Sequence, residues 1–351
     1  MKVLLTGDKG YIGSVLSPMI LERGHEVNGL DSDLFADCTY CGELADIRSI
    51  DVDVRDVEAQ YLSGFDAVIH LAGLSNDPLG DYNPGLTQAI NTDASVRLAQ
   101  LAKSAGVKRF LFASSCSTYG AAGESFLDES AQFNPVTPYG KSKVDVEKQL
   151  SAMADDSFSP TFLRASTAYG MSPRIRFDLV VNNLVAWAFT TGEIHLKSDG
   201  TPWRPLVHVR DIALAYISAL EAPIEAVHMR AFNVGTTAEN YQVRDVAEIV
   251  SQVVPGSKVG FADGAGPDTR NYRVDCNRIA LDLHEFKPQW TVRRGIEELY
   301  EAFCQHGLEL QDFEGERYKR IAHVQKMVAD GSLKPDLRRT SATQKQTGTG
   351  S

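Results

Sequence analysis

The first 170 residues alternate short apolar runs with longer stretches of helical spacing, and this alternation limits the possible folds more than any other feature. The apolar runs that we expect to form strands are KVLLT, EVNGLD, IRSIDVD, AVIHLAG, RFLFASS and TFLRAS. A long helix is expected over residues 84–105, and another begins where Thr137 can cap a helix with Pro138 at its first position. Strands that alternate with helices of this length are typical of βαβ units. We therefore predict an α/β fold with a doubly wound parallel sheet.

A glycine-rich turn follows the first predicted strand in the segment LLTGDKGYIG, which places Gly7, Gly10 and Gly13 ahead of the first helix. Glycines let a backbone turn tightly and approach a pyrophosphate, which then lies at the helix N-terminus. The spacing is G-x-x-G-x-x-G rather than the commoner G-x-G-x-x-G, so the triplet gains its weight from its place between a strand and a helix. The pattern predicts a Rossmann-type domain that binds a dinucleotide.

The second predicted strand ends at Asp31, and a carboxylate at this position discriminates between the two nicotinamide dinucleotides. It can accept hydrogen bonds from the adenosine ribose hydroxyls, and it repels a 2′-phosphate. Lys9, inside the glycine turn, could instead reach such a phosphate. We expect NAD as the cofactor and keep NADP as the alternative.

After about residue 170 the alternation loosens, which predicts a second and smaller part of the molecule. We expect an NAD-binding Rossmann domain over residues 1–170, to which a segment at about 205–235 returns, and a smaller α/β substrate-binding lobe over 171–310. A C-terminal helix is predicted within residues 311–334. The polar residues 335–351 are expected to form a disordered tail.

The overall charge and the cysteines argue against several classes of protein. A net charge of -11, from 35 basic and 46 acidic residues, disfavours nonspecific binding to nucleic acid, which needs clustered Lys and Arg. No apolar run approaches the ~20 residues of a membrane span, and the N-terminus lacks the features of a signal peptide. The five cysteines are scattered, and Cys38 and Cys41 lack two further close ligands. We expect a cytoplasmic protein with no metal site, no nucleic-acid partner and no membrane partner.

A tyrosine and a lysine four residues apart mark the candidate reaction centre in the segment TPYGKSK. On a helix, Tyr139 and Lys143 share one face. A free phenol has a pKa of about 10, and a nearby ammonium group favours its phenolate form. Tyr139 could then take a proton from a hydroxyl or return one to a ketone. The pair follows the polar strand end SSCSTYG, whose hydroxyls are costly to bury without partners.

Several of these segments together resemble the extended short-chain dehydrogenase/reductase family, in its nucleotide-sugar epimerase/dehydratase branch. The resembling segments are TGDKGYIG, Asp31, DVRD at 53–56, HLAG at 70–73, SSCSTYG at 114–120, PYGKSK at 138–143, GTPWRPLVHVRDIALA at 200–215 and, more loosely, DTRNYRVDCNRI at 268–279. The resemblance covers about residues 1–305. It implies a nucleotide-diphosphate sugar as substrate, and a homodimer formed through the helices at about 84–105 and 139–153.

The resemblance also implies a role for each matching residue. The catalytic residues would be Ser115, Tyr139 and Lys143. The cofactor would contact Gly7, Gly10, Tyr11, Ile12, Gly13, Asp31, Asp53, Val54, Leu71, Ala72, Gly73, Asn91, Ser114, Tyr139 and Lys143. The substrate would contact Ser117, Asn182 or Asn183, Arg204 and Arg270. Arg174 and Arg176, in the segment MSPRIRF, could meet phosphates or belong to a solvated face, and the sequence leaves both open.

The two residues after the catalytic serine discriminate among the reactions of this family. Family dehydratases carry Asp-Glu directly after the catalytic Thr, and the Glu serves elimination at the neighbouring carbon. Cys116 and Ser117 stand at these positions here. The resemblance therefore implies an NAD-dependent nucleotide-diphosphate-sugar epimerase that acts at C4 through a transient 4-keto sugar, with Tyr139 as base and hydride passing to NAD. The alternative is an NAD(P)H-dependent 4-ketoreductase of deoxysugar biosynthesis, while a 4,6-dehydratase and a noncatalytic dinucleotide-binding protein are disfavoured.

Overall fold

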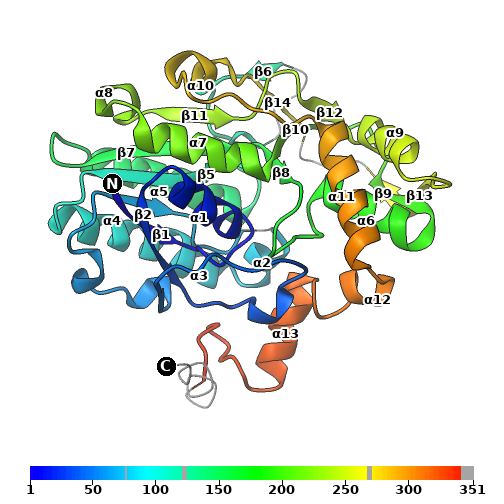
Figure 1. Ribbon diagram of the computed structural model, residues 1–351, viewed down its shortest axis with the longest axis horizontal. Coiled ribbons are helices and arrows are strands. Elements are labelled where there is room, and N and C mark those ends of the chain that lie inside the picture. Colours follow the sequence, from blue (N-terminus) through cyan, green and yellow to red (C-terminus); the bar gives the residue numbers. More distant parts are fainter. Residues whose placement is uncertain (76, 121–124, 267–270, 341–351) are drawn as a thin grey trace.

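The computed structural model describes residues 1–75, 77–120, 125–266 and 271–340 (Figure 1). Its centre is a seven-stranded sheet with the order β11-β7-β5-β4-β1-β2-β3, and every neighbouring pair in it is parallel. The strands are β1 (Lys2–Thr6), β2 (Glu26–Asp31), β3 (Ser49–Asp51), β4 (Ala67–His70), β5 (Arg109–Ser115), β7 (Ser159–Ala165) and β11 (Ala231–Val234). The strand order changes direction between β1 and β4, which confirms the doubly wound α/β fold. Ligands of such sheets bind beyond the carboxyl ends of the strands at this switch point.

Alternating side chains of the strands fill two cores, one on each face of the sheet. On one face Leu5 and its neighbours pack against α1 (Gly13–Glu22) and α7 (Val209–Glu221). On the other face Leu4 and its neighbours pack against α4 (Ala94–Ser104) and α5 (Pro138–Met153). Helices therefore cover both faces, which is why the strands read as continuous apolar runs in the sequence.

The helix predicted over residues 84–105 is divided into shorter parts. It follows α2 (Asp77–Tyr82) and begins as α3 (Pro84–Thr87), capped by the Asn83 side chain. One π-helical turn then covers Gln88–Asp93, and α4 starts at Ala94. The apolar spacing of the sequence predicts the helical state but not the wider turn, which places the buried Asn91 toward the loop after β4.

A third core lies beside the carboxyl ends of the sheet strands, and apart from Cys38 its buried residues come after residue 166. Its helices are α6 (Val180–Thr191), α9 (Val243–Val253) and α11 (Val292–His306). Its strands are β8 (Thr167–Tyr169), β9 (Glu193–Ser198), β10 (Trp203–His208), β12 (Asn240–Gln242) and β13 (Lys258–Gly266). They form the sets β12-β10-β8 and β13-β9. Further short elements are β6 (Phe126–Leu127), β14 (Arg273–Val274), α8 (Ile224–Val227), α10 (Asn277–Asp282) and α12 (Leu310–Phe313).

The C-terminal segment, residues 314–340, runs back from this third core to the loops that follow β2 and β3 (Figure 1). It contains α13 (Arg320–Ala329). The structure differs here from the predicted disordered tail, because Leu337 is buried and Arg338 pairs with Asp56. Disorder from residue 335 is therefore wrong for residues 335–340, and the rest of the predicted tail, 341–351, lies outside the described residues. Within the described chain, no helix has the length and apolar character needed to cross a membrane.

Candidate active site

A first cavity lies where the chain leaves β1, and the glycine turn forms part of its wall. The turn residues that line it are Gly7, Lys9, Gly10, Tyr11, Ile12 and Gly13. Gly7 has a φ of 77°, and a Cβ there would lie 2.8 Å from the Ala72 nitrogen. A Cβ at Gly13 would lie 2.0 Å from the Gly7 oxygen, which is far inside contact distance. The turn thus presents bare backbone at the N-terminus of α1, the arrangement on which pyrophosphate binding depends.

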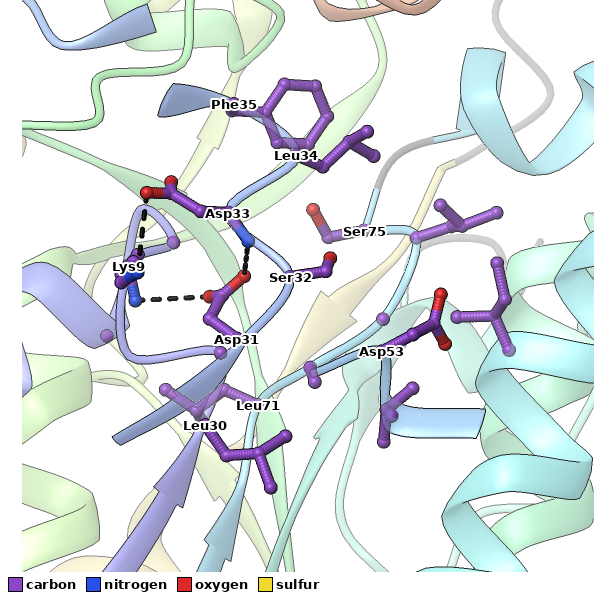
Figure 2. A pocket seen from close by; sticks show the side chains of 18 of the residues that line it. Lys9, Leu30, Asp31, Ser32, Asp33, Leu34, Phe35, Asp53, Leu71 and Ser75 are labelled. Atoms are coloured by element: carbon purple, nitrogen blue, oxygen red, sulfur yellow. Dashed lines mark hydrogen bonds and ion pairs between the residues drawn. The ribbon is translucent and has the colours of Figure 1, made fainter. Parts of the chain in front are cut away.

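Asp31 lies at the carboxyl end of β2 and lines the same cavity (Figure 2). Its carboxylate accepts hydrogen bonds from the backbone nitrogens of Asp33, at 2.8 Å, and Lys9, at 3.1 Å. Burial, together with the nearby Asp8 carboxylate, raises the pKa of Asp31 to about 6. The Lys9 ammonium lies 3.5 Å from the Asp33 carboxylate. Because Lys9 is paired with Asp33, it is less available to bind the 2′-phosphate of NADP.

Asp53 and Val54 follow β3 and also line the first cavity. The Asp53 carboxylate is engaged by Arg55, whose Nε and Nη2 lie 2.9 and 2.6 Å from its two oxygens. Val54 is buried and contributes an apolar surface of the kind that packs against the flat face of a base. The structure therefore places both predicted residues at the cavity, with the Asp53 charge balanced by its own neighbour.

The loop after β4 brings Leu71, Ala72 and Gly73 to the cavity, whereas Asn91 lines neither this cavity nor the second one described below. The Asn91 carboxamide accepts from the Leu74 nitrogen at 2.7 Å and donates to the Leu74 oxygen at 2.9 Å. The structure differs here from the expected cofactor contact, because Asn91 holds the loop that carries Gly73.

Ser114 also differs from its expected role. Its hydroxyl donates to the Glu147 carboxylate, which is paired with Arg164 at 2.7 Å. Ser114 lines the second cavity rather than the first. The hydroxyl is therefore engaged by the protein itself, and it anchors the polar strand end to α5.

The second cavity contains the three residues expected to act in catalysis. Ser115 ends β5, Tyr139 and Lys143 lie one turn apart on α5, and all three line this cavity. The Lys143 ammonium lies 5.4 Å from the centre of the Tyr139 ring and 4.8 Å from that of Phe112. Burial lowers the pKa of Lys143 to about 8, so the side chain is still mostly protonated at pH 7. A protonated lysine at this distance favours the phenolate form of the tyrosine.

Arg176 lies on a wall that the two cavities share. The residues that line both are Ile12, Leu71, Gly73, Leu74, Ser75 and Arg176. The Arg176 guanidinium pairs with Asp178 at 2.6 Å and donates to the Ser75 hydroxyl at 3.2 Å. Arg174, equally buried, pairs with Asp33 at 3.0 Å. The solvated-face alternative is therefore wrong for both arginines, and Arg176 joins the candidate site.

The second cavity has a volume of about 730 Å³, within the range of small-molecule sites. Of the expected substrate residues, Ser117, Asn183 and Arg204 line it. Asn182 lines neither cavity, because its carboxamide bonds to the Gly170 nitrogen and the Arg176 oxygen, each at 2.9 Å. Arg270 lies outside the described residues.

His195 and Lys197 are lining residues that the sequence did not reveal. Alternate residues of a strand face the same side, and in β9 Ile194 and Leu196 are buried in the third core. The alternation of polar and apolar residues in EIHLKS indicates that His195 and Lys197 share the polar side of β9. Only the packing of β9 beside α6 shows that this polar side faces a cavity. The described residues contain no group of three or more His, Cys, Asp or Glu side chains that could hold a metal ion.

The dinucleotide cradle opens beside a cavity that holds a tyrosine and a lysine on one helical face, and this combination defines an extended short-chain dehydrogenase/reductase. The model of the NAD dependent epimerase/dehydratase family matches residues 3–235, and the chain belongs to this family.

Curated and solved proteins agree with this assignment. The chain is 30% identical over 268 residues to UDP-glucose 4-epimerase of Corynebacterium glutamicum, covering 72% of this chain and 80% of that protein. It is 28% identical to the Bacillus subtilis UDP-glucose 4-epimerase, covering 85% and 94%. The Thermus thermophilus UDP-glucose 4-epimerase, solved with NAD, has a TM-score of 0.73 at 25% identity, with 87% of this chain and 99% of that chain covered. A protein solved with UDP-glucuronic acid and NAD has a TM-score of 0.75 at 26% identity, with the same coverage.

NAD is the cofactor of this family, and the first cavity fits it. A Cβ at Gly7 or Gly13 would break the close backbone packing of the glycine turn, and the turn lies at the N-terminus of α1, where a pyrophosphate binds. Asp31 offers a carboxylate at the position that receives ribose hydroxyls. The loop of Leu71 and Gly73 then leads from this cavity into the one that holds Tyr139 and Lys143.

Proposed function

We propose that this enzyme is an NAD-dependent nucleotide-diphosphate-sugar epimerase that acts at C4 of its sugar through a transient 4-keto intermediate. The observation that carries the proposal is the placement of Ser115, Tyr139 and Lys143 in a cavity that shares a wall with the cofactor cavity. UDP-glucose 4-epimerases among its relatives support the reaction, and solved neighbours bound to UDP-sugars support the class of substrate.

Bound NAD would supply the hydride acceptor, and later the hydride donor, for the reacting carbon. The Tyr139 phenolate takes the proton of the hydroxyl on that carbon, and the Lys143 ammonium stabilises the phenolate charge. The Ser115 oxygen accepts a hydrogen bond from the Ser117 nitrogen at 3.1 Å, which leaves its own proton available for the reacting sugar oxygen. Once the keto sugar has rotated in the cavity, so that its other face is reduced, Tyr139 returns the proton to the sugar oxygen and the epimer forms.

The environment of the strand end argues against elimination of water. The Cys116 thiol is buried and donates to the Arg164 oxygen at 3.1 Å, and burial raises its pKa to about 12. It therefore does not exchange protons near pH 7. Among the described residues that line the second cavity, the acidic one is Asp178, whose carboxylate is paired with Arg176. Cys116 and Ser117 therefore supply no carboxyl group directly after the catalytic serine, where dehydratases of this family carry one.

A group of basic and polar side chains suits the diphosphate of the substrate. Lys197 and His195 from β9, Arg204 from β10 and Asn183 from α6 all line the cavity. Charge-assisted hydrogen bonds to phosphate oxygens are the strong ones, and a planar arginine can make two at once. We assign these four residues to the nucleotide diphosphate. A homodimer and a cytoplasmic location stay predictions.

The test is to incubate the protein with UDP-glucose, UDP-glucuronic acid and dTDP-glucose, with and without added NAD, and to follow products by NMR and mass. We expect an epimer of unchanged mass, formed without net consumption of a dinucleotide. Tyr139→Phe should lower kcat by about 10²–10⁴-fold while leaving NAD binding within about threefold. Tyr61→Phe, at a tyrosine that lines neither cavity, is the matched control.

Three outcomes would contradict the proposal. Loss of 18 mass units, roughly one water, would indicate a dehydratase. Stoichiometric oxidation of NADPH or NADH with a keto sugar would indicate the ketoreductase alternative. Unchanged turnover in Tyr139→Phe would remove this residue from the mechanism.

A further inference from the structure

The C-terminal segment supplies part of the cofactor cavity, although it lies outside the residues that match the family model. Leu337 and Arg320 both line this cavity. Arg339 donates to the Ser32 and Asp33 oxygens at 3.1 and 2.5 Å, in the turn directly after Asp31. The segment is thus bonded to the same loop that faces the cofactor site.

A second set of contacts ties the segment to the turn after β3. Arg55 donates to the Asp336 oxygen at 2.9 Å, and Arg338 pairs with Asp56 at 2.9 Å. Arg55 is also the residue that engages Asp53. The turns after β2 and β3 are therefore both held by residues 336–339, which extend the cavity wall beyond the Rossmann domain.

Arg320, the first residue of α13, differs from the other arginines around it. It is 7% exposed, its Nη2 donates to the Arg174 oxygen at 3.3 Å, and its guanidinium lies 4.0 Å from the centre of the Phe35 ring. Its Nε has no hydrogen-bond partner among the described residues. Arg174 and Arg176 pair with Asp33 and Asp178, whereas no described carboxylate forms an ion pair with Arg320.

A buried cation without an anion is unfavourable, and an anion that enters the cavity relieves it. Burial, with Arg176 adding to it, lowers the pKa of Arg320 to about 10, so the guanidinium is still charged at pH 7. The other cations that line this cavity, Lys9, Arg55 and Arg176, are each paired with an aspartate. Arg320 forms no ion pair with a described carboxylate, and the acidic side chain that acts on its charge, Asp178, is already paired with Arg176.

We propose that Arg320 binds the pyrophosphate of the cofactor, and that the C-terminal segment retains the dinucleotide in its cavity between turnovers. Arg320 lines the cavity of the glycine turn and not the second cavity, which assigns it to the dinucleotide rather than to the nucleotide sugar. The retention role rests on the proposed function, because an epimerase returns hydride from the same dinucleotide that received it. The binding role requires only that the protein takes NAD.

The test compares cofactor-free wild-type protein with Arg320→Met, using displacement of NADH fluorescence by NAD, ADP and adenosine. Met keeps the length of the side chain and its packing on Phe35 but removes the charge. We expect affinity for NAD and ADP to fall at least tenfold, which is about 1.4 kcal/mol, while that for adenosine stays within twofold. NADH should also leave the variant at least tenfold faster.

Arg317→Met is the matched control. Arg317 belongs to the same segment, lies over the Tyr318 ring, donates to the Thr39 oxygen and lines neither cavity. We expect this variant to bind all three ligands as the wild type does. If Arg320→Met does not fold, Arg320→Gln, which keeps a donor for the Arg174 oxygen, makes the same comparison.

Several results would overturn the assignment. Equal loss for adenosine and ADP would mean that Arg320 only holds the segment in place. No loss of affinity for NAD or ADP would show that Arg320 does not bind the pyrophosphate. Because these measurements use no nucleotide sugar, they can fail while epimerisation is observed, or succeed in a protein that proves to lack it.

Discussion

Arg164→Met is expected to destabilise the protein by about 3–5 kcal/mol, because it leaves the Glu147 carboxylate buried without its partner. The side chains of Arg164 and Glu147 are only 6% and 5% exposed. Arg164 reaches both carboxylate oxygens, at 3.0 and 2.7 Å. Its other donors bind the Tyr119 hydroxyl at 2.9 Å and the Glu129 oxygen at 3.1 Å. The single substitution therefore removes a charge partner and several buried hydrogen bonds at once.

The matched control replaces both charges, as Arg164→Met with Glu147→Met. We expect this double variant to recover about 2 kcal/mol relative to Arg164→Met, since apolar residues often replace a buried ion pair at small cost. The free energy of unfolding is measured by urea titration with linear extrapolation. If the single and double variants lose equal stability, or if the single variant loses less than about 1 kcal/mol, the carboxylate is not the buried, uncompensated charge on which this reasoning depends.

Two further predictions concern the ligand cavities. Lys143→Met should lower kcat at pH 7 by about 100-fold or more and make the remaining rate rise with pH, because Tyr139 must then ionise without a neighbouring ammonium; a pH profile parallel to that of the wild type would contradict this role. Asp31→Asn should stabilise the cofactor-free protein at pH 7 by about 1–3 kcal/mol while weakening NAD binding at least tenfold. The sign follows from the raised pKa of Asp31, about 6 when folded against 3.8 for the unperturbed group. The ionised carboxylate costs stability only as the pH rises from about 4 through 6, so urea titrations that show the same gain at pH 3.5 and 7 would refute this cause.

The parts of the site that the sequence predicts are those fixed by local geometry. Tyr139 and Lys143 share a helical face because of their spacing, and Pro138 marks where that helix begins. Gly7 and Gly13 are recognisable because a strand precedes the turn and a helix follows it. Each of these signals is contained in a few consecutive residues, and each matching element is present in the structure.

The parts that the sequence could not predict depend on contacts between distant segments. Asn182 and Asn183 are neighbours on α6, and which one faces the cavity is decided by the packing of α6 near Gly170. α6 is apolar on most sides, so its hydrophobic pattern does not indicate a face. Ser114 and Ser115 are both hydroxyl residues at the end of β5, so the sequence does not distinguish their roles. Only the position of Glu147 on α5 shows that the Ser114 hydroxyl is bound by the protein itself.

The contacts of residues 336–339 also bear on the order in which the molecule is completed during synthesis. β1, β2 and β3 and their turns are made first, yet the wall over those turns includes Leu337 and the bonds of Arg339. A growing chain can therefore pair its first strands early but cannot finish the cofactor cavity until residue 339 has left the ribosome. Contacts between residues that are distant in the sequence also form late in folding, because closing such a long loop costs entropy before the contacts that stabilise it are made. Dinucleotide capture should accordingly be one of the last events in the maturation of this protein.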